Sequence, residues 1–154
     1  MANTFTQIHI HAVFTVQNRT SLINKEWKER LYEYITGIIQ KNGHKLLSIN
    51  GVQDHIHILF GMRPSQSLSE LMQDIKADSS RWINLNKFVG GKFSWQEGYA
   101  AFSYSKSLLP AVIKYIKNQE EHHRRITFIE EYRKILTDFN IEFDERYIFK
   151  PIEQ

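Results

Sequence analysis

Cysteine is absent from this chain of 154 residues. The absence excludes disulfide scaffolds, thiolate zinc sites and cysteine nucleophiles. Proline and glycine are scarce, at 3 and 7 residues, which excludes collagen-like and low-complexity chains. The chain also lacks a run of about 18 apolar residues, so no membrane span is predicted. Its first residues show no basic stretch followed by an apolar one, so no signal peptide is predicted and we expect a cytoplasmic protein.

The residues that are present have the ordinary composition of a globular protein. Hydrophobic residues make up 42% of the chain and charged residues 24%. The length corresponds to about one domain, so we expect residues 1–154 to form a single domain. The net charge is +3 and the isoelectric point is near 9.1. This mild positive excess permits a nucleic-acid partner but does not require one.

The alternation of apolar and polar residues, and the turn residues between them, predict the order of strands and helices. The expected elements are, in chain order, a strand at 7–16, a helix at 24–42, strands at 45–52 and 55–61, a helix after 67, a mobile loop at 86–98, a strand at 99–105, helices at 107–125 and 127–139, and a tail at 140–154. Asn24 is the expected cap of the first helix and Gly43 its end, while capping boxes open the second and the last helix. This order indicates an α+β fold of ferredoxin-like (RRM-like) type with a mostly antiparallel sheet.

Two histidines two residues apart are the first candidates for chemistry. In a strand, positions i and i+2 point to the same side, so His55 and His57 can present two imidazoles to one metal ion. The alternative is a pair of sheet histidines that form hydrogen bonds to their neighbours. His9 and His11 have the same spacing and equally apolar flanks. Because their strand is expected to lie beside the other, all four histidines could share one face.

The predicted helix at 107–125 carries a second group of candidates. Tyr115 and Gln119 are four residues apart, so a phenol and an amide project from the same edge of the helix, and His122 continues that edge. Taken alone, this pair is also typical of a tyrosine that packs its ring beside a solvated glutamine. Combined with two histidines, it permits phosphodiester chemistry. A metal ion could polarise a phosphate, a tyrosine could then attack the phosphorus, and a set of two nitrogens and one amide oxygen suits Mn²⁺ or Mg²⁺.

These motifs resemble a known family. The segment His55-Ile56-His57 resembles the HUH motif of tyrosine-dependent single-strand DNA endonucleases, and Tyr115-x-x-x-Gln119 resembles the tyrosine helix of single-tyrosine transposases from the smallest bacterial insertion sequences, the IS200-like family. The resemblance extends over 14–19, 95–103 (WQEGYAAFS) and 127–149, and therefore over nearly the whole chain. It implies an HUH endonuclease fold of the ferredoxin-like type.

The resemblance also implies a mechanism. Such enzymes cleave and rejoin single-stranded DNA at hairpin-flanked element ends through a 5′-phosphotyrosine, without ATP. Carried over residue by residue, Tyr115 would be the nucleophile, and His55, His57 and Gln119 would hold Mg²⁺ or Mn²⁺. The family acts as a homodimer in which the tyrosine helix of one subunit meets the histidines of the other. The stretch 86–98 would help to position that helix, while His122 and His123 fall beyond the motif and are expected to support the site or to lie on the surface.

Single-stranded DNA hairpins as partners require positive charge for the phosphates. The candidate DNA-binding residues are Arg19, Lys76, Arg81, Lys87 and Lys92. Three other functions stay open. An RNA-binding module of the same fold would carry aromatic residues where this chain has His9, His11, His55 and His57. A domesticated relative would bind or nick repeat hairpins without moving an element, and a metal-dependent nuclease would use water and keep Tyr115 for structure.

Overall fold

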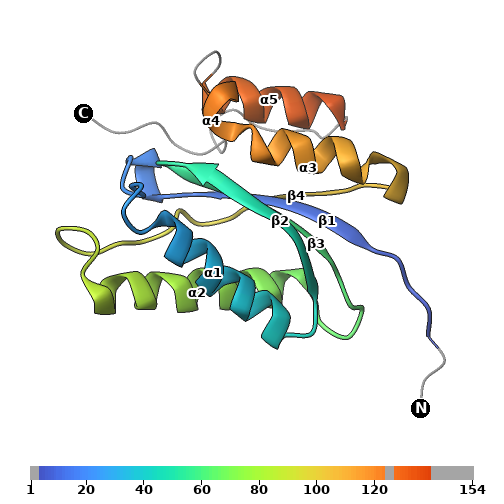
Figure 1. Cartoon of the computed structure of the whole chain (residues 1–154), viewed down its shortest axis with the longest axis horizontal. Helices are drawn as coiled ribbons and strands as arrows, with labels where there is room; N and C mark the ends of the chain where they lie inside the picture. Colours follow the sequence, from blue (N-terminus) through green and yellow to red (C-terminus); the bar gives the residue numbers. More distant parts are fainter. Residues whose placement is uncertain (1–3, 124–126, 140–154) are drawn as a thin grey trace.

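The computed structural model describes residues 4–123 and 127–139, and these residues form a four-stranded antiparallel sheet covered by helices on both faces (Figure 1). The strands are β1 (His9–Thr15), β2 (Lys45–Val52), β3 (His55–Gly61) and β4 (Ala100–Ser103), in the spatial order β2-β3-β1-β4. Strands β2 and β3 form a hairpin, and β1 lies between β3 and β4. The order of elements and the sheet topology confirm the predicted ferredoxin-like α+β fold.

Each strand divides its side chains between two layers because successive residues point to opposite faces of the sheet. Helices α1 (Lys28–Lys41) and α2 (Leu68–Asn86) cover one face, where they enclose the main core. Phe14, Ile56, Ile58 and Phe60 are fully buried in this core. The residues that alternate with these in β3 therefore face the opposite layer; they include His55, His57 and Leu59.

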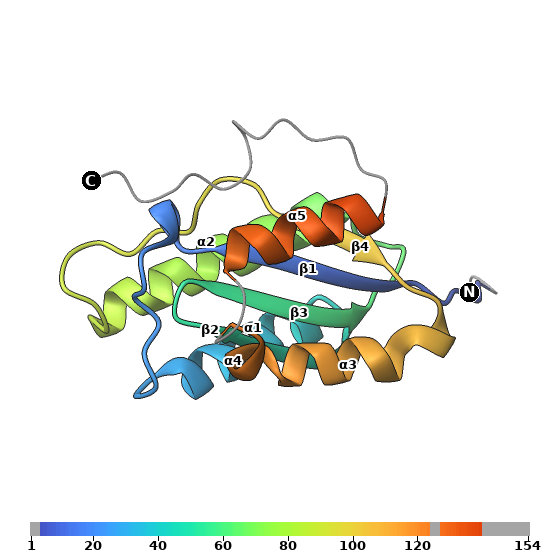
Figure 2. The ribbon, with the colours of Figure 1, turned by 90° about the horizontal axis from the view of Figure 1, so that it is seen from above.

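Helices α3 (Leu109–Lys117), α4 (Gln119–His122) and α5 (Phe128–Asp138) form that opposite layer, preceded by a short 3-10 turn at Lys106–Leu108. Figure 2 shows α3 and α5 lying beside one another across the sheet, with α3 toward the β2 edge and α5 over β1. Two small apolar clusters hold them there. Val112 and Ile116 of α3 pack on Leu59, and Phe128 and Leu136 of α5 pack with Val13 and the β4 side chains.

The prediction of a single helix at 107–125 is wrong, because the structure divides this segment into α3 and α4 at Asn118. Asn118 has backbone angles of φ −95° and ψ 22°, and asparagine is a weak helix former. The Asn50 side chain of β2 donates to the Ile116 and Lys117 carbonyl oxygens at 2.9 and 3.0 Å. These bonds satisfy the carbonyl groups at the end of α3 and fix that end to the sheet.

The start of the first helix is also shifted. The structure begins α1 at Lys28, four residues after the predicted cap Asn24. The Asn24 side chain accepts a hydrogen bond from the Glu26 amide at 3.0 Å, so it caps a turn that precedes the helix. The predicted end is confirmed at Gly43, whose φ of +88° favours glycine. Both capping boxes place Ser67 and Thr127 as helix caps, as predicted.

The stretch 86–98 is more firmly packed than the mobile loop that its glycines predict. Phe93 and Trp95 are buried in the main core, and the Trp95 indole donates to the Ser79 hydroxyl at 2.9 Å. The Asn84 side chain exchanges two hydrogen bonds with the Phe93 backbone, at 2.7 and 3.0 Å. Large aromatic side chains therefore outweigh the glycines in the second half of this segment. The predicted tail at 140–154 lies outside the described residues.

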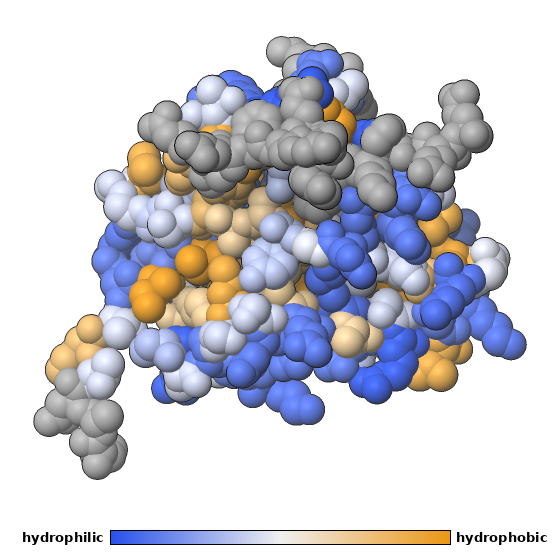
Figure 3. Space-filling model, turned by 180° about the vertical axis from the view of Figure 1, so that it is seen from behind, coloured by the Kyte–Doolittle hydropathy of each residue, from blue (hydrophilic) through white to orange (hydrophobic). Residues whose placement is uncertain are grey.

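Among the described residues, no helix is both long and apolar enough to span a bilayer. Seen from behind, on the side of edge strand β4, apolar side chains gather along the middle of the molecule above a largely hydrophilic lower margin (Figure 3).

Gly51 provides a test of how closely β2 must approach the histidine strand. It lies opposite Ile56, and a Cβ atom at this position would collide with the His55 carbonyl oxygen and lie 3.0 Å from the Ile56 Cα. We therefore expect Gly51→Ala to lower the free energy of unfolding by about 1–3 kcal/mol, measured by urea denaturation. Gly37→Ala is the matched control, because that helical glycine has open space around it and alanine there should raise stability by about 0.5–1 kcal/mol. Equal stability of the Gly51→Ala variant and the wild type would contradict this interpretation.

Candidate active site

His55 and His57 occupy the centre of the sheet, on the face that α3, α4 and α5 cover. Both side chains are 0% exposed. Strand β3 is hydrogen-bonded to β2 on one side and to β1 on the other, so the register of three strands fixes both positions. The predicted projection of the two imidazoles from one face is therefore what the structure contains.

Both rings are oriented by partners at Nδ1. His55 Nδ1 lies 2.7 Å from the Asp54 carboxylate, and His57 Nδ1 lies 2.8 Å from His11 Nε2. Each Nε2 atom is thus left to face α4 and α5, as a metal ligand would require. Burial lowers the pKa of His57 to about 4, so its ring is neutral near pH 7. Burial also lowers the pKa of His55, but hydrogen bonds to Asp54 and Glu131 outweigh it and raise that pKa above its usual value.

Of the second histidine pair, the structure brings only His11 to the site. His11 is fully buried and stacks on His57, with ring centroids 5.0 Å apart. Burial and the neighbouring His57 lower the pKa of His11 to about 3. His9 lies opposite Gly61 near the start of β1 and is only partly buried. His9 and His11 are two residues apart on β1 and so share one face of the strand, but only His11 is close enough to contact His57.

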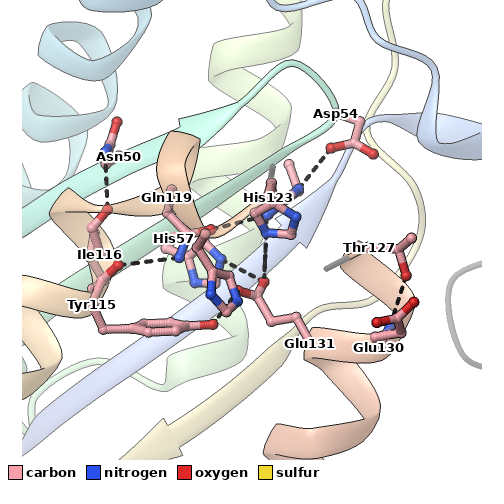
Figure 4. A network of polar contacts seen from close by, with 12 residues as sticks. Asn50, Asp54, His57, Tyr115, Ile116, Gln119, His123, Thr127, Glu130 and Glu131 are labelled. Atoms are coloured by element: carbon pink, nitrogen blue, oxygen red, sulfur yellow. Dashed lines mark hydrogen bonds and ion pairs between the residues drawn. The ribbon is translucent and has the colours of Figure 1, made fainter. Parts of the chain in front are cut away.

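Tyr115 and Gln119 reach the histidines from the two sides of the break at Asn118 (Figure 4). The Tyr115 ring centroid lies 5.8 Å from that of His57. Gln119 is fully buried, and its Oε1 lies 3.4 Å from His55 Nε2 while its amide nitrogen donates to the Tyr115 carbonyl oxygen at 3.3 Å. Burial and the nearby Glu131 raise the pKa of Tyr115, so the phenol carries its proton here.

Glu131 of α5 is the site residue that sequence reasoning missed. Its side chain is 2% exposed and reaches between the histidines and the tyrosine (Figure 4). The Tyr115 hydroxyl donates a hydrogen bond to Oε2, and His57 Nε2 lies 3.2 Å from Oε1. The preceding residue, Glu130, belongs to the capping box, in which the Thr127 side chain accepts a hydrogen bond from the Glu130 amide. A signal for Glu131 exists, because it follows the apolar residue Phe128 by three positions, so the two side chains share one side of α5, and both are buried.

His122 and His123 join the same carboxylate. His122 Nε2 lies 2.9 Å from Glu131 Oε2, and His123 Nε2 lies 3.3 Å from Oε1. Burial alone would raise the pKa of Glu131, but hydrogen bonds from His123, His55 and His57 hold it far below its usual range. The carboxylate is therefore ionised at neutral pH. The two histidines belong to the site and not to the open surface.

Two hollows flank this cluster. One, of about 560 Å³, is lined by Asp54 and His123 and has a basic rim of Arg19, Lys25 and Lys28. The other, of about 370 Å³, lies between α3 and α5, and Tyr115 and Glu131 form part of its wall. Each hollow therefore reaches residues at the edge of the cluster.

The predicted DNA-binding residues separate into two groups. Arg19 borders the larger hollow, close to Asp54. The other four lie on α2 or just beyond it, in the layer on the opposite face of the sheet. Lys76 donates from its ammonium to the Gln96 and Gly98 carbonyl oxygens at 2.6 and 2.8 Å, and Arg81 pairs with Asp78. Lys87 and Lys92 border a shared open hollow at the end of α2.

The donor set fits a divalent cation. The Nε2 atoms of His55 and His57 and a Glu131 oxygen all lie within 4.8 Å of one another. Asp54 and His11 hold the rings so that these nitrogens face inward. Imidazole nitrogens combined with carboxylate and amide oxygens suit Mn²⁺, and Mg²⁺ when phosphate and water complete the shell.

Comparison with known proteins places these features in context. Residues 4–119 match the family model described as "Transposase IS200 like". The "ISDra2 transposase TnpA" of Deinococcus radiodurans is 22% identical over 120 residues, covering 75% of this chain and 86% of the relative.

Two solved structures share the fold. One is a crystal structure of a Deinococcus radiodurans R1 protein assigned as a transposase, with a TM-score of 0.61 and 20% identity over 77% of this chain and 95% of that one. The other is a REP-associated tyrosine transposase bound to a REP hairpin, with a TM-score of 0.61 and 13% identity over 100% of this chain and 96% of that one. The family match contains His55, His57 and Tyr115, and it ends at Gln119.

Proposed function

The chain belongs to the IS200-like transposase family, and on this premise we propose that it cleaves and rejoins single-stranded DNA at hairpin-flanked ends through a 5′-phosphotyrosine on Tyr115. The observation that carries the proposal is the meeting of Tyr115 with the buried pair His55 and His57. The hairpin in the REP-associated structure supports DNA hairpins as the partner.

His55, His57 and Gln119 are the proposed ligands of a divalent cation, Mg²⁺ or Mn²⁺. When bound, such an ion acts as a Lewis acid on a phosphate oxygen. The chain itself does the positioning. Asp54 and His11 hold the imidazoles, and Asn50 fixes the end of α3 to β2 and so sets the place of Tyr115 and Gln119. A catalytic group held in this way needs little reorientation before the reaction.

The proposed reaction exchanges one phosphodiester bond for another. The Tyr115 phenol oxygen attacks phosphorus, the bond from phosphorus to the 3′ oxygen breaks, and the fragment on the 3′ side stays on the protein through its 5′ phosphate. In net terms the phenol proton ends on the 3′ oxygen, which leaves as a hydroxyl. A second 3′-hydroxyl reverses the step and regenerates the tyrosine. Because the number of phosphodiester bonds is conserved, no nucleotide triphosphate is needed.

A repeat-hairpin nicking protein is the second candidate function. The REP-associated transposase covers the whole of this chain, whereas the Deinococcus structure covers 77% of it. The catalytic residues would be the same in both cases. Hairpins that flank the coding sequence as a pair of element ends favour transposition, and scattered hairpin repeats favour the second function.

A labelled hairpin oligonucleotide tests the proposed chemistry. Single-stranded hairpin DNA from the flanking sequence, labelled at its 3′ end and incubated with the protein and Mn²⁺, is expected to give an SDS-stable adduct, because the 3′-side fragment keeps the 5′ phosphate. The same oligonucleotide labelled at its 5′ end should yield a free, shortened fragment. Cleavage without any adduct in either labelling would contradict the tyrosine mechanism and support a nuclease that uses water.

Sharing of the site across a homodimer is a further prediction of the family resemblance. One chain already brings its own Tyr115 beside its own His57, so the geometry supports a site within one subunit as well. If the sites are shared, cleavage is restored when Tyr115→Phe and His57→Ala proteins are coexpressed as a heterodimer; if each site lies within one subunit, the heterodimer stays inactive. With shared sites, one of the two active sites in the heterodimer would carry neither substitution. An inactive heterodimer, its composition verified by native mass spectrometry, would contradict sharing.

A further inference from the structure

Glu131 stands out because its two carboxylate oxygens face different parts of the site. Oε1 points to imidazole nitrogens, at 3.2 Å from His57, 3.3 Å from His123 and 3.6 Å from His55. Oε2 accepts the hydrogen bond of the Tyr115 hydroxyl. The same carboxylate therefore touches both the proposed ligands and the proposed nucleophile.

The distances around Oε1 are those expected between two ligands of one ion. Atoms bound at about 2.0–2.2 Å from a common cation lie roughly 3.0–3.6 Å from one another. The Nε2 atoms of His57 and His55 fall in this range, at 3.2 Å and 3.6 Å from Glu131 Oε1. The Gln119 side-chain oxygen lies at a similar distance, 3.4 Å, from His55 Nε2. Oε1 thus takes the place of a neighbouring ligand and not the place of the ion itself.

Charge supports the same reading. Two imidazoles and an amide are neutral ligands, and a divalent cation held only by them in a fully buried site would lack a compensating charge. Glu131 places a carboxylate in that same buried space, 3.2 Å from His57 and 3.6 Å from His55. Carboxylate oxygen is also the ligand that Mg²⁺ and Mn²⁺ favour over softer alternatives.

We propose that Glu131 binds the divalent cation through Oε1 and fixes the Tyr115 hydroxyl through Oε2, so that one side chain couples the metal to the nucleophile. This inference rests on the proposed function, in which His55 and His57 hold the ion. It extends that function to α5, a helix that begins nine residues beyond the end of the family match at Gln119.

Binding of Mn²⁺ in the absence of DNA tests the metal half. Free Mn²⁺ is measured by its electron paramagnetic resonance signal during titration of the folded, full-length protein. We expect Glu131→Ala and Glu131→Gln to weaken Mn²⁺ binding at least about tenfold. Glu130→Gln is the matched control, since Glu130 is the exposed preceding residue on the same helix, and its affinity should equal that of the wild type. Melting temperatures of the metal-free proteins show whether each variant is folded, and Glu131→Gln keeps the shape of the buried side chain.

The possible outcomes distinguish a failure of the Glu131 inference from a failure of the proposed function. If the wild type binds Mn²⁺ and the Glu131 variants bind it equally well, Glu131 is no ligand and the inference fails while the proposed function stands. If the wild type binds Mn²⁺ no better than His57→Ala does, the metal site of the proposed function is rejected, and the inference about Glu131 is rejected with it. Binding that weakens in both Glu131 variants and not in Glu130→Gln supports the inference.

The tyrosine half is tested at saturating Mn²⁺ and saturating hairpin DNA. Glutamine offers a single acceptor oxygen, so in Glu131→Gln a side-chain oxygen that binds the cation leaves no second oxygen to accept the Tyr115 hydroxyl proton, and the amide nitrogen can only donate. We expect the rate of adduct formation to stay at least about tenfold below that of the wild type after the metal site is filled. Recovery of the full rate at high Mn²⁺ would overturn the positioning of Tyr115 by Glu131.

Discussion

Tyr115→Phe is expected to abolish the covalent protein–DNA adduct, a loss of about a thousandfold or more, while hairpin binding is kept. Only the hydroxyl is removed, and the ring keeps its place between His57 and His122. The lost hydrogen bond to Glu131 should lower stability by about 1 kcal/mol, because His57, His122 and His123 still surround that carboxylate.

The adduct is quantified on denaturing gels with labelled hairpin DNA, and binding is measured separately by a mobility shift. Tyr104→Phe is the matched control, since Tyr104 also borders the hollow between α3 and α5 but is not the proposed nucleophile. An adduct that persists in Tyr115→Phe and disappears in Tyr104→Phe would move the nucleophile to Tyr104.

His57→Ala and His55→Ala form the second prediction, with losses of cleavage of about a hundredfold or more and with hairpin binding largely kept. Each change removes a proposed ligand of the ion that polarises the phosphate, and Mn²⁺ affinity should fall in parallel. The losses are measured as adduct yield across an Mn²⁺ titration, so that weak binding and slow chemistry can be told apart.

The histidines of β1 serve as graded controls for this experiment. His9→Ala should leave cleavage close to that of the wild type, because His9 is only partly buried near the start of the strand. His11→Ala should have an intermediate effect of about tenfold to a hundredfold, because His11 orients His57 through the 2.8 Å contact. Cleavage that depends on His9 and His11 but not on His55 and His57 would overturn the assignment of the metal to β3.

Much of the fold could be predicted because local patterns and packing agree. The hairpin strands β2 and β3 have the predicted bounds, because apolar residues run through both segments and the two residues 53–54 mark the turn between them. The predictions were wrong where tertiary contacts decide. Asn50 binds the carbonyl oxygens that close α3, and buried Phe93 and Trp95 fix a glycine-containing segment. Neither contact is visible from local sequence.

For the site, residues that share a motif could be predicted, and residues brought in by packing could not. His55 and His57 are adjacent on one strand, and Tyr115 and Gln119 are one helical turn apart. Glu131 reaches the cluster only because α5 packs on Val13 and the β4 side chains. His11 joins because the register of β1 against β3 places it diagonally across from His57.

The complete burial of both β3 histidines and Gln119 beneath the outer helices has a consequence for how long a protein–DNA junction can survive. A phosphotyrosine can be attacked by water as well as by a 3′-hydroxyl, and water is by far the more abundant of the two. In the proposed function, a covering layer that keeps water from the junction would give the second DNA end time to arrive. The packing of α5 on the sheet would then favour rejoining over hydrolysis, which a strand-transfer enzyme needs and a simple nuclease does not.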